Sequence, residues 1–143
     1  MKVIIAGSRS VTDVAIVRKC FDNFYFRFVI EETVCGWARG VDRTGRLVGL
    51  ERFISSVPFP ADWDGPLKKR AGMARNQEMA DYADCLLAIW DGVSTGTKDM
   101  IDRAVEGGLY VEVWSASGEL QDVYNDYWTG RWKHLRKRHK SAP

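Results

Sequence analysis

The chain has 143 residues, 45% of them hydrophobic, and a net charge of +2, which suits one globular domain and is too short for two. No apolar run approaches the ~20 residues of a membrane span, and the N-terminus lacks a signal-peptide pattern. Three scattered cysteines, and two histidines confined to the tail, exclude a disulfide framework and a His-based catalytic or metal site in the main body. We therefore expect a cytoplasmic protein with no metal site and no membrane contact.

The first half of the chain predicts strands that alternate with helices. Apolar, β-branched runs predict three strands, at 2–6, 29–35 and 54–59. Apolar side chains at helical spacing predict one helix that begins after Thr12 or Asp13 and a second over 41–52. Gly45 and Gly49 share one face of the second helix, so we expect this face to pack closely against a neighbour.

The second half continues the alternation. A helix begins near Ala71, and a buried strand at 85–90 leads through the turn 91–96 into a further helix, which Gly107 ends. A fifth strand follows at 109–114. Five strands that alternate with four helices predict a single α/β domain, Rossmann-like and doubly wound, with a mostly parallel five-stranded sheet.

Residues 115–143 form an aromatic-rich, basic extension to the domain at 1–114. Six of the 21 Lys and Arg residues lie at 131–140, whereas all 19 acids precede Tyr127, so the tail carries +6 and the body −4. A further helix is predicted by the spacing of Leu120, Val123, Tyr124, Tyr127 and Trp128.

Polar, Gly-rich loops follow the first four strands, so they meet at the carboxyl edge of the predicted sheet, where ligands bind in such folds. Small residues let a ligand approach the backbone, hydroxyls donate to phosphate, and a helix N-terminus favours an anion. The predicted ligand-binding residues are Gly7, Ser8, Arg9, Gly36, Ala38, Arg39, Gly40, Asp42, Asp62, Trp63, Arg75, Asn76, Ser94, Thr95, Gly96 and Thr97.

Individual residues in this set have two interpretations each. The candidate charge partners of an anion are Arg9, Arg39 and Arg75, although an isolated Arg is often a solvated surface side chain. Asp42 contacts a sugar or base, or it favours the dipole of its own helix. Trp63 stacks on a base that Asp62 holds, or it closes the end of the core.

The basic tail also has two interpretations. One is a solubilising charged end. The other is a nucleic-acid contact with Trp128 and Trp132 as stacking surfaces and phosphate contacts from Arg131, Lys133, Arg136, Lys137, Arg138 and Lys140. The aromatic segment at 124–132 could in turn cover a second copy in a homo-oligomer or fold back on its own sheet.

Five motifs occur in order within residues 2–114: Gly7-Ser8-Arg9, Gly36-x-Ala38-Arg39-Gly40-x-Asp42, Pro60-Ala61-Asp62-Trp63, Ala71-Gly72-x-x-Arg75-Asn76 and Ser94-x-Gly96-Thr97. Together they resemble the YspA-type, YpsA-related branch of the SLOG superfamily, which also includes DprA/Smf and the LOG hydrolases. The resemblance implies a Rossmann-like domain that binds a nucleotide or nucleotide-derived molecule, ADP-ribose-like or a nucleoside monophosphate. It implies a sensor or sequestering role and no required cofactor.

The alternative is an enzyme that cleaves or transfers at the N-glycosidic bond of a nucleotide. The motifs of this chain differ from those of such enzymes at two positions. LOG-type hydrolases have an Arg-Lys pair, and this chain has Arg75-Asn76 at the matching position. They also have a glutamate in the catalytic site, and Met100 occupies that position here. Methionine cannot stabilise an oxocarbenium-like centre or position water. Asp99 stands one residue early, about 100° around the helix. The remaining candidates for the acting carboxylate are Asp99, Asp42 and Asp62.

Overall fold

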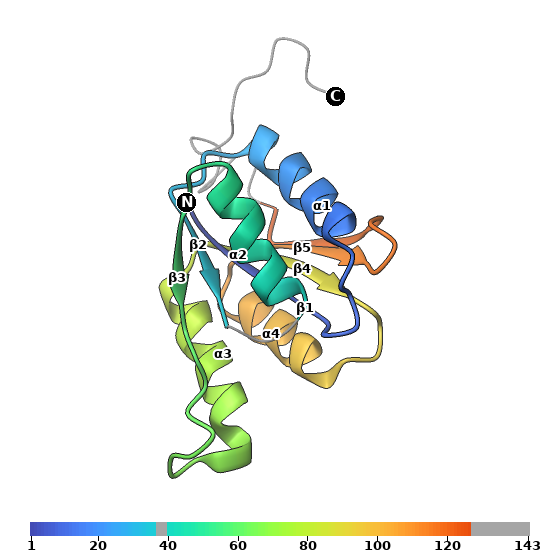
Figure 1. Cartoon of the computed structure of the whole chain (residues 1–143). Helices are drawn as coiled ribbons and strands as arrows, with labels where there is room; N and C mark the ends of the chain where they lie inside the picture. Colours follow the sequence, from blue (N-terminus) through green and yellow to red (C-terminus); the bar gives the residue numbers. More distant parts are fainter. Residues whose placement is uncertain (37–39, 127–143) are drawn as a thin grey trace.

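The computed structural model describes residues 1–36 and 40–126, in which a mostly parallel sheet lies between two layers of helices (Figure 1). Its elements in chain order are β1 (Lys2–Gly7), α1 (Val14–Arg27), β2 (Glu32–Cys35), α2 (Val41–Glu51), β3 (Ser55–Pro58), a 3-10 turn (Lys68–Arg70), α3 (Ala71–Tyr82), β4 (Cys85–Trp90), α4 (Thr95–Glu106), β5 (Tyr110–Ser115) and β6 (Leu120–Tyr124). The strand order is β3-β2-β1-β4-β5-β6, and all neighbours are parallel except β5 and β6. The predicted doubly wound, Rossmann-like fold is confirmed.

The two faces of the sheet are covered by different helices. Helices α1 and α2 lie on one face, and α3 and α4 lie on the other (Figure 1). Alternate residues of β1 enter the two cores, with Val3 and Ile5 on the α1 side and Ile4 and Ala6 on the α3 side. Because β1 and β4 are covered on both faces, their sequences are continuous apolar runs.

Helix α2 packs directly on the sheet through its two glycines. A Cβ on Gly45 would lie 2.3 Å from Cγ2 of Ile5, and one on Gly49 would lie 3.1 Å from Cγ2 of Thr33. The predicted close contact of this helix face is therefore confirmed.

The predicted start of α1 is confirmed as well, since the carboxylate of Asp13 accepts a hydrogen bond from the backbone of Ala15 at 2.9 Å.

The predicted helix after residue 115 is wrong for its described part. Leu120–Tyr124 forms β6, a sixth strand, which pairs antiparallel with β5 through a tight turn in which Ser115 N–H donates to the Glu119 carbonyl at 2.7 Å. The open edge of β5 offers a row of unpaired backbone groups, and the returning chain satisfies them. This hairpin outweighs a helical spacing of three apolar residues. Tyr127 and Trp128 lie outside the described residues.

The three cysteines are free and buried. Burial raises the pKa of the Cys20 thiol to about 12, so this thiol stays protonated at neutral pH. In the described ranges, no helix is both long enough and apolar enough to cross a membrane.

Candidate functional site

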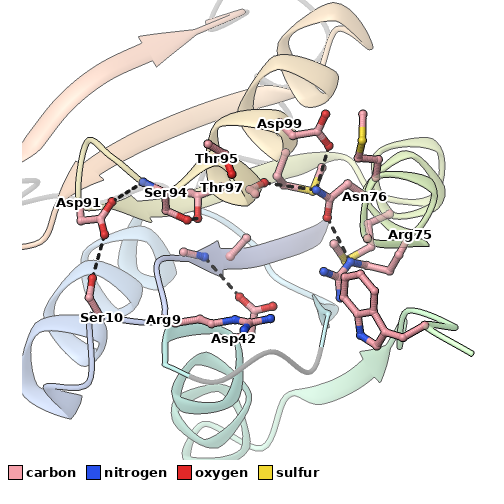
Figure 2. A pocket seen from close by; sticks show the side chains of 18 residues that line it. Arg9, Ser10, Asp42, Arg75, Asn76, Asp91, Ser94, Thr95, Thr97 and Asp99 are labelled. Carbon is pink, nitrogen blue, oxygen red and sulfur yellow. Dashed lines mark hydrogen bonds between the residues drawn. The ribbon is translucent and has the colours of Figure 1, made fainter. Parts of the chain in front are cut away.

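The candidate site is a cavity of about 720 Å³ beyond the carboxyl ends of β1 and β4 (Figure 2). The chain leaves β1 toward β2 on one side and β4 toward β5 on the other, so the strand order reverses between these two neighbours. Such a switch point opens a crevice where the two following loops diverge. The cavity is lined by residues that follow β1, β3 and β4, by Asp42 of α2 and by residues of α3 and α4.

Ten of the predicted ligand-binding residues line the cavity: Gly7, Arg9, Asp42, Trp63, Arg75, Asn76, Ser94, Thr95, Gly96 and Thr97. Four others do not line it, namely Ser8, Gly36, Gly40 and Asp62. Ala38 and Arg39 lie outside the described residues, as do the basic side chains predicted to contact nucleic acid: Arg131, Lys133, Arg136, Lys137, Arg138 and Lys140.

Three of the residues that do not line the cavity shape its loops instead. The hydroxyl of Ser8, which is buried, accepts a hydrogen bond from the backbone of Asp91 at 3.0 Å. The carbonyl of Gly36 accepts a hydrogen bond from Nη1 of Arg75. Gly40 precedes α2 with φ at +75°, and a Cβ there would lie 2.8 Å from the Ser8 carbonyl oxygen.

Asp91 and Ser10 line the cavity and were not predicted. One carboxylate oxygen of Asp91 accepts the backbone N–H groups of Val93 and Ser94, at 2.9 and 2.8 Å, and the other accepts the Ser10 hydroxyl at 2.9 Å (Figure 2). These hydrogen bonds lower the pKa of Asp91 to about 2, so it is ionised at neutral pH. Its position directly after a buried strand, at the ligand edge, was the available signal.

Helix α4 points an uncapped N-terminus at the cavity. The hydroxyl of its N-cap residue, Ser94, makes no hydrogen bond to the helix backbone in the described structure and instead contacts the Thr97 hydroxyl at 3.3 Å. The first N–H groups of an α-helix have no partner within the helix. A Cβ on Gly96 would meet no atom within 4 Å, so the cavity is open at this turn. The turn therefore offers donors to an anion.

Two arginines line the same cavity, Arg9 and Arg75. Burial lowers the pKa of Arg75, the neighbouring Asp42 carboxylate opposes this effect, and the positive charge of Arg9 adds to it. Among the ion pairs formed within the described ranges, none includes either arginine. The cavity lining thus holds two arginines that form no ion pair in the described part of the chain, together with the carboxylates of Asp42, Asp91 and Asp99.

One oxygen of the Asp99 carboxylate, in α4, is engaged by the protein. Asp99 lines the cavity despite its offset of one residue, but its Oδ2 accepts hydrogen bonds from Asn76 at 3.0 Å and from Arg103 at 2.9 Å. Met100, at the position of the hydrolase glutamate, also lines the cavity and is 1% exposed.

The remaining wall of the cavity is apolar. Trp63 is half-exposed, and its indole lies over Gly72 at the start of α3, with Cη2 2.9 Å from the place of a Gly72 Cβ. Met73 also lines the cavity. This wall is a flat surface on which an aromatic ring can stack. Across the described part of the chain, no group of three His, Cys, Asp or Glu side chains is arranged to hold a metal ion.

The fold and the cavity define a doubly wound α/β protein with a cavity at its topological switch point. No protein-family model and no curated protein matches the chain. Its fold is similar to the X-ray structure of DNA processing protein A (DprA) from Streptococcus pneumoniae, with a TM-score of 0.61 and 18% sequence identity. The match covers 80% of this chain and 49% of the DprA chain, so this chain matches about half the length of that protein.

Proposed function

We propose that this protein binds a nucleotide or nucleotide-derived molecule as a sensor or sequestering module. The observation that carries the proposal is the pairing of two arginines, Arg9 and Arg75, with the open N-terminal turn of α4 around one cavity. A phosphate in this cavity would accept hydrogen bonds from that turn and neutralise the arginines. The similarity to DprA supports the fold on which this proposal rests.

The dimensions and the apolar wall favour a nucleotide over a small inorganic anion. A volume of about 720 Å³ lies within the range of small-molecule sites, ~300–1,000 Å³. The Trp63 indole offers a stacking surface for the base, while phosphate occupies the polar end.

The side chains near α4 favour binding over hydrolysis. Met100 supplies no carboxylate, and Oδ2 of Asp99 is engaged by Asn76 and Arg103. Of the other two candidate carboxylates, Asp42 accepts the backbone N–H of Gly7 at 3.3 Å, and Asp62 does not line the cavity. We therefore expect no free base to be released from AMP, NAD or ADP-ribose on incubation with the protein. Release of base by the purified protein would contradict this part of the proposal and favour the alternative of an N-glycosidic enzyme.

A thermal-shift panel tests binding with AMP, GMP, ADP-ribose, NAD, adenosine and inorganic phosphate. A ligand at about 100 times its dissociation constant adds roughly 2.7 kcal/mol to the free energy of unfolding. For a domain of this size, that raises Tm by several degrees. We expect a shift with one phosphorylated class and a smaller one with adenosine. A flat panel at millimolar concentrations would overturn the proposal.

Gly96→Asp locates the phosphate. The new carboxylate projects into open space at the α4 turn. There it interacts favourably with the positive end of the helix dipole, and it repels a bound phosphate. We expect folding to be retained and affinity to fall by roughly tenfold or more. Val93→Asp is the matched control, since Val93 is 80% exposed in the same loop and does not line the cavity. Equal losses in both variants would place the phosphate elsewhere.

A further inference from the structure

The side chain of Asn76 lines the cavity, yet its amide is engaged by the protein. It is 6% exposed. Its Nδ2 donates to the Gly96 carbonyl at 3.3 Å and to Oδ2 of Asp99 at 3.0 Å, and its Oδ1 accepts from Nε of Arg75 at 3.1 Å. An asparagine amide has two N–H donors, and both are used here. Asn76 therefore has no donor left for a ligand.

These hydrogen bonds join two parts of the phosphate end of the cavity. Figure 2 shows Asn76 between Asp99 and Arg75, with the α4 turn beside it. On one side, Asn76 holds Nε of Arg75 while Nη1 of the same guanidinium donates to the Gly36 carbonyl. On the other side, it holds the Gly96 carbonyl in the first turn of α4. One amide thus sets the position of a cation relative to a helix N-terminus.

The orientation of the Asn76 amide is itself fixed from behind. Asp99 can only accept hydrogen bonds when ionised, so it requires the NH₂ side of the amide to face it. Asp99 is in turn paired with Arg103 at 2.9 Å, and Arg103 donates to Gln77 at 3.0 Å. This chain of contacts leaves Oδ1 of Asn76 pointing to Arg75, which is the only arrangement that satisfies all three partners.

We propose that Asn76 is a positioning residue, which orients the Arg75 guanidinium and the first turn of α4 toward one anionic group without contacting that group. The proposal rests on the anion-binding function proposed above. Its consequence is that Arg75 contributes to binding only when Asn76 holds it, so the two residues act as one unit.

Calorimetric titration with AMP and with inorganic phosphate tests this coupling in the full chain. We expect Asn76→Ala and Arg75→Ala each to weaken binding by roughly tenfold or more. The double variant should bind with the same affinity as the single variant of lower affinity, because either change alone already removes the joint contribution of Asn76 and Arg75. Glu78→Ala is the matched control on the same helix, since Glu78 is exposed and does not line the cavity, and it should bind as the wild type does. Losses that multiply in the double variant would overturn the coupling.

Two further variants separate positioning from general destabilisation. Asp99 is 23% exposed, and Asp99→Ala removes the carboxylate that holds the Asn76 amide, so it should weaken binding. Asp99→Asn keeps an oxygen that accepts from Asn76 and should bind more tightly than Asp99→Ala. In the ligand-free protein, the Nε–H signal of Arg75 in ¹H–¹⁵N NMR should be protected from exchange in the wild type and in Asp99→Asn, and lose that protection in Asn76→Ala.

The outcomes distinguish the two proposals. A wild-type protein that binds AMP, together with an Asn76→Ala variant of equal affinity, overturns the positioning role and leaves the binding function intact. A wild-type protein that binds neither AMP nor phosphate, nor any other member of the panel, overturns the binding function and the positioning role with it.

Discussion

At the scale of single residues, two glycines of the predicted site, Gly7 and Gly36, are required by contacts within the protein. A Cβ on Gly7 would lie 2.3 Å from the Ile89 carbonyl oxygen, and one on Gly36 would lie 2.3 Å from Nη1 of Arg75. Any larger residue would push β4 or the arginine away. These glycines therefore shape the cavity even where they do not line it, which explains why small residues recur at its edge.

Asp91 gives a residue-scale prediction on pH. Its hydrogen bonds lower its pKa in the folded state from 3.8 to about 2. Its contribution to stability is therefore present above its unfolded pKa and is lost as pH falls through the folded value. We expect Asp91→Asn to lower the free energy of unfolding at pH 7, and the deficit relative to wild type to shrink as pH falls from about 5 toward 2. Urea unfolding across this range measures it.

The control for this measurement is Asp64→Asn, which changes an exposed carboxylate outside the cavity. A deficit of Asp91→Asn that stays constant from pH 7 to pH 2 would show that the charge of Asp91 has no role in stabilising the turn.

At the scale of elements, helices α2 and α4 use glycine for opposite reasons. Gly45 lets α2 approach β1 until no space for a Cβ remains, because Ile5 lies directly beneath it. Gly96 lies in the first turn of α4, beside an open cavity, so space for a side chain exists there. The first glycine serves packing, and the second leaves room at the α4 turn.

We therefore predict opposite effects of alanine at these two helix positions. Gly45→Ala should destabilise the protein by about 1–3 kcal/mol, because overpacking outweighs the gain in helix propensity. Gly96→Ala should leave stability unchanged or raise it by up to about 1 kcal/mol. Urea unfolding of the two variants measures the difference. Stabilisation by both would show that α2 can move away from the sheet at little cost.

At the scale of the whole molecule, a buried ion pair joins one helical layer to the sheet. Glu112 of β5 is 0% exposed, and its two carboxylate oxygens accept hydrogen bonds from Nη2 of Arg27, at 2.9 and 2.7 Å. The Tyr110 hydroxyl and, at 3.1 Å, the Trp114 indole also donate to this carboxylate. Burial, with the neighbouring carboxylate, raises the pKa of Tyr110 and keeps its hydroxyl a donor. The cluster anchors the end of α1 on β5.

Breaking this pair on one side should cost more than removing its charge on both sides. Arg27→Met leaves the Glu112 carboxylate buried without a counter-ion, and we expect a loss of about 3–5 kcal/mol. Arg27→Met combined with Glu112→Gln removes the charge and keeps an acceptor for Tyr110 and Trp114, so it should recover part of that loss. Chemical denaturation measures both. A single variant within about 1 kcal/mol of wild type would contradict an anchoring role.

Elements that depend on local pattern were predicted well. The apolar run of β4 and the glycines of α2 led to the correct element and the correct contact, because periodicity and side-chain size are local properties. Segment 120–124 was predicted wrongly, since its pairing depends on the free edge of β5 and not on its own spacing. For Asp91 the local part of its role, the hydrogen bonds from Val93 and Ser94, could have been predicted, whereas its contact with Ser10, 81 residues away, depends on the fold.

By itself, the sequence determined the alternation of strands and helices, the carboxyl edge at which the polar loops meet, and the residue types available there. Only the tertiary structure decided which of these side chains face a cavity and which hold one another. Arg75, Asn76 and Asp99 illustrate the physical reason, since each was identifiable as polar, but hydrogen-bond capacity is shared among neighbours. Whether a donor remains for a ligand therefore depends on which partners the fold brings within about 3 Å.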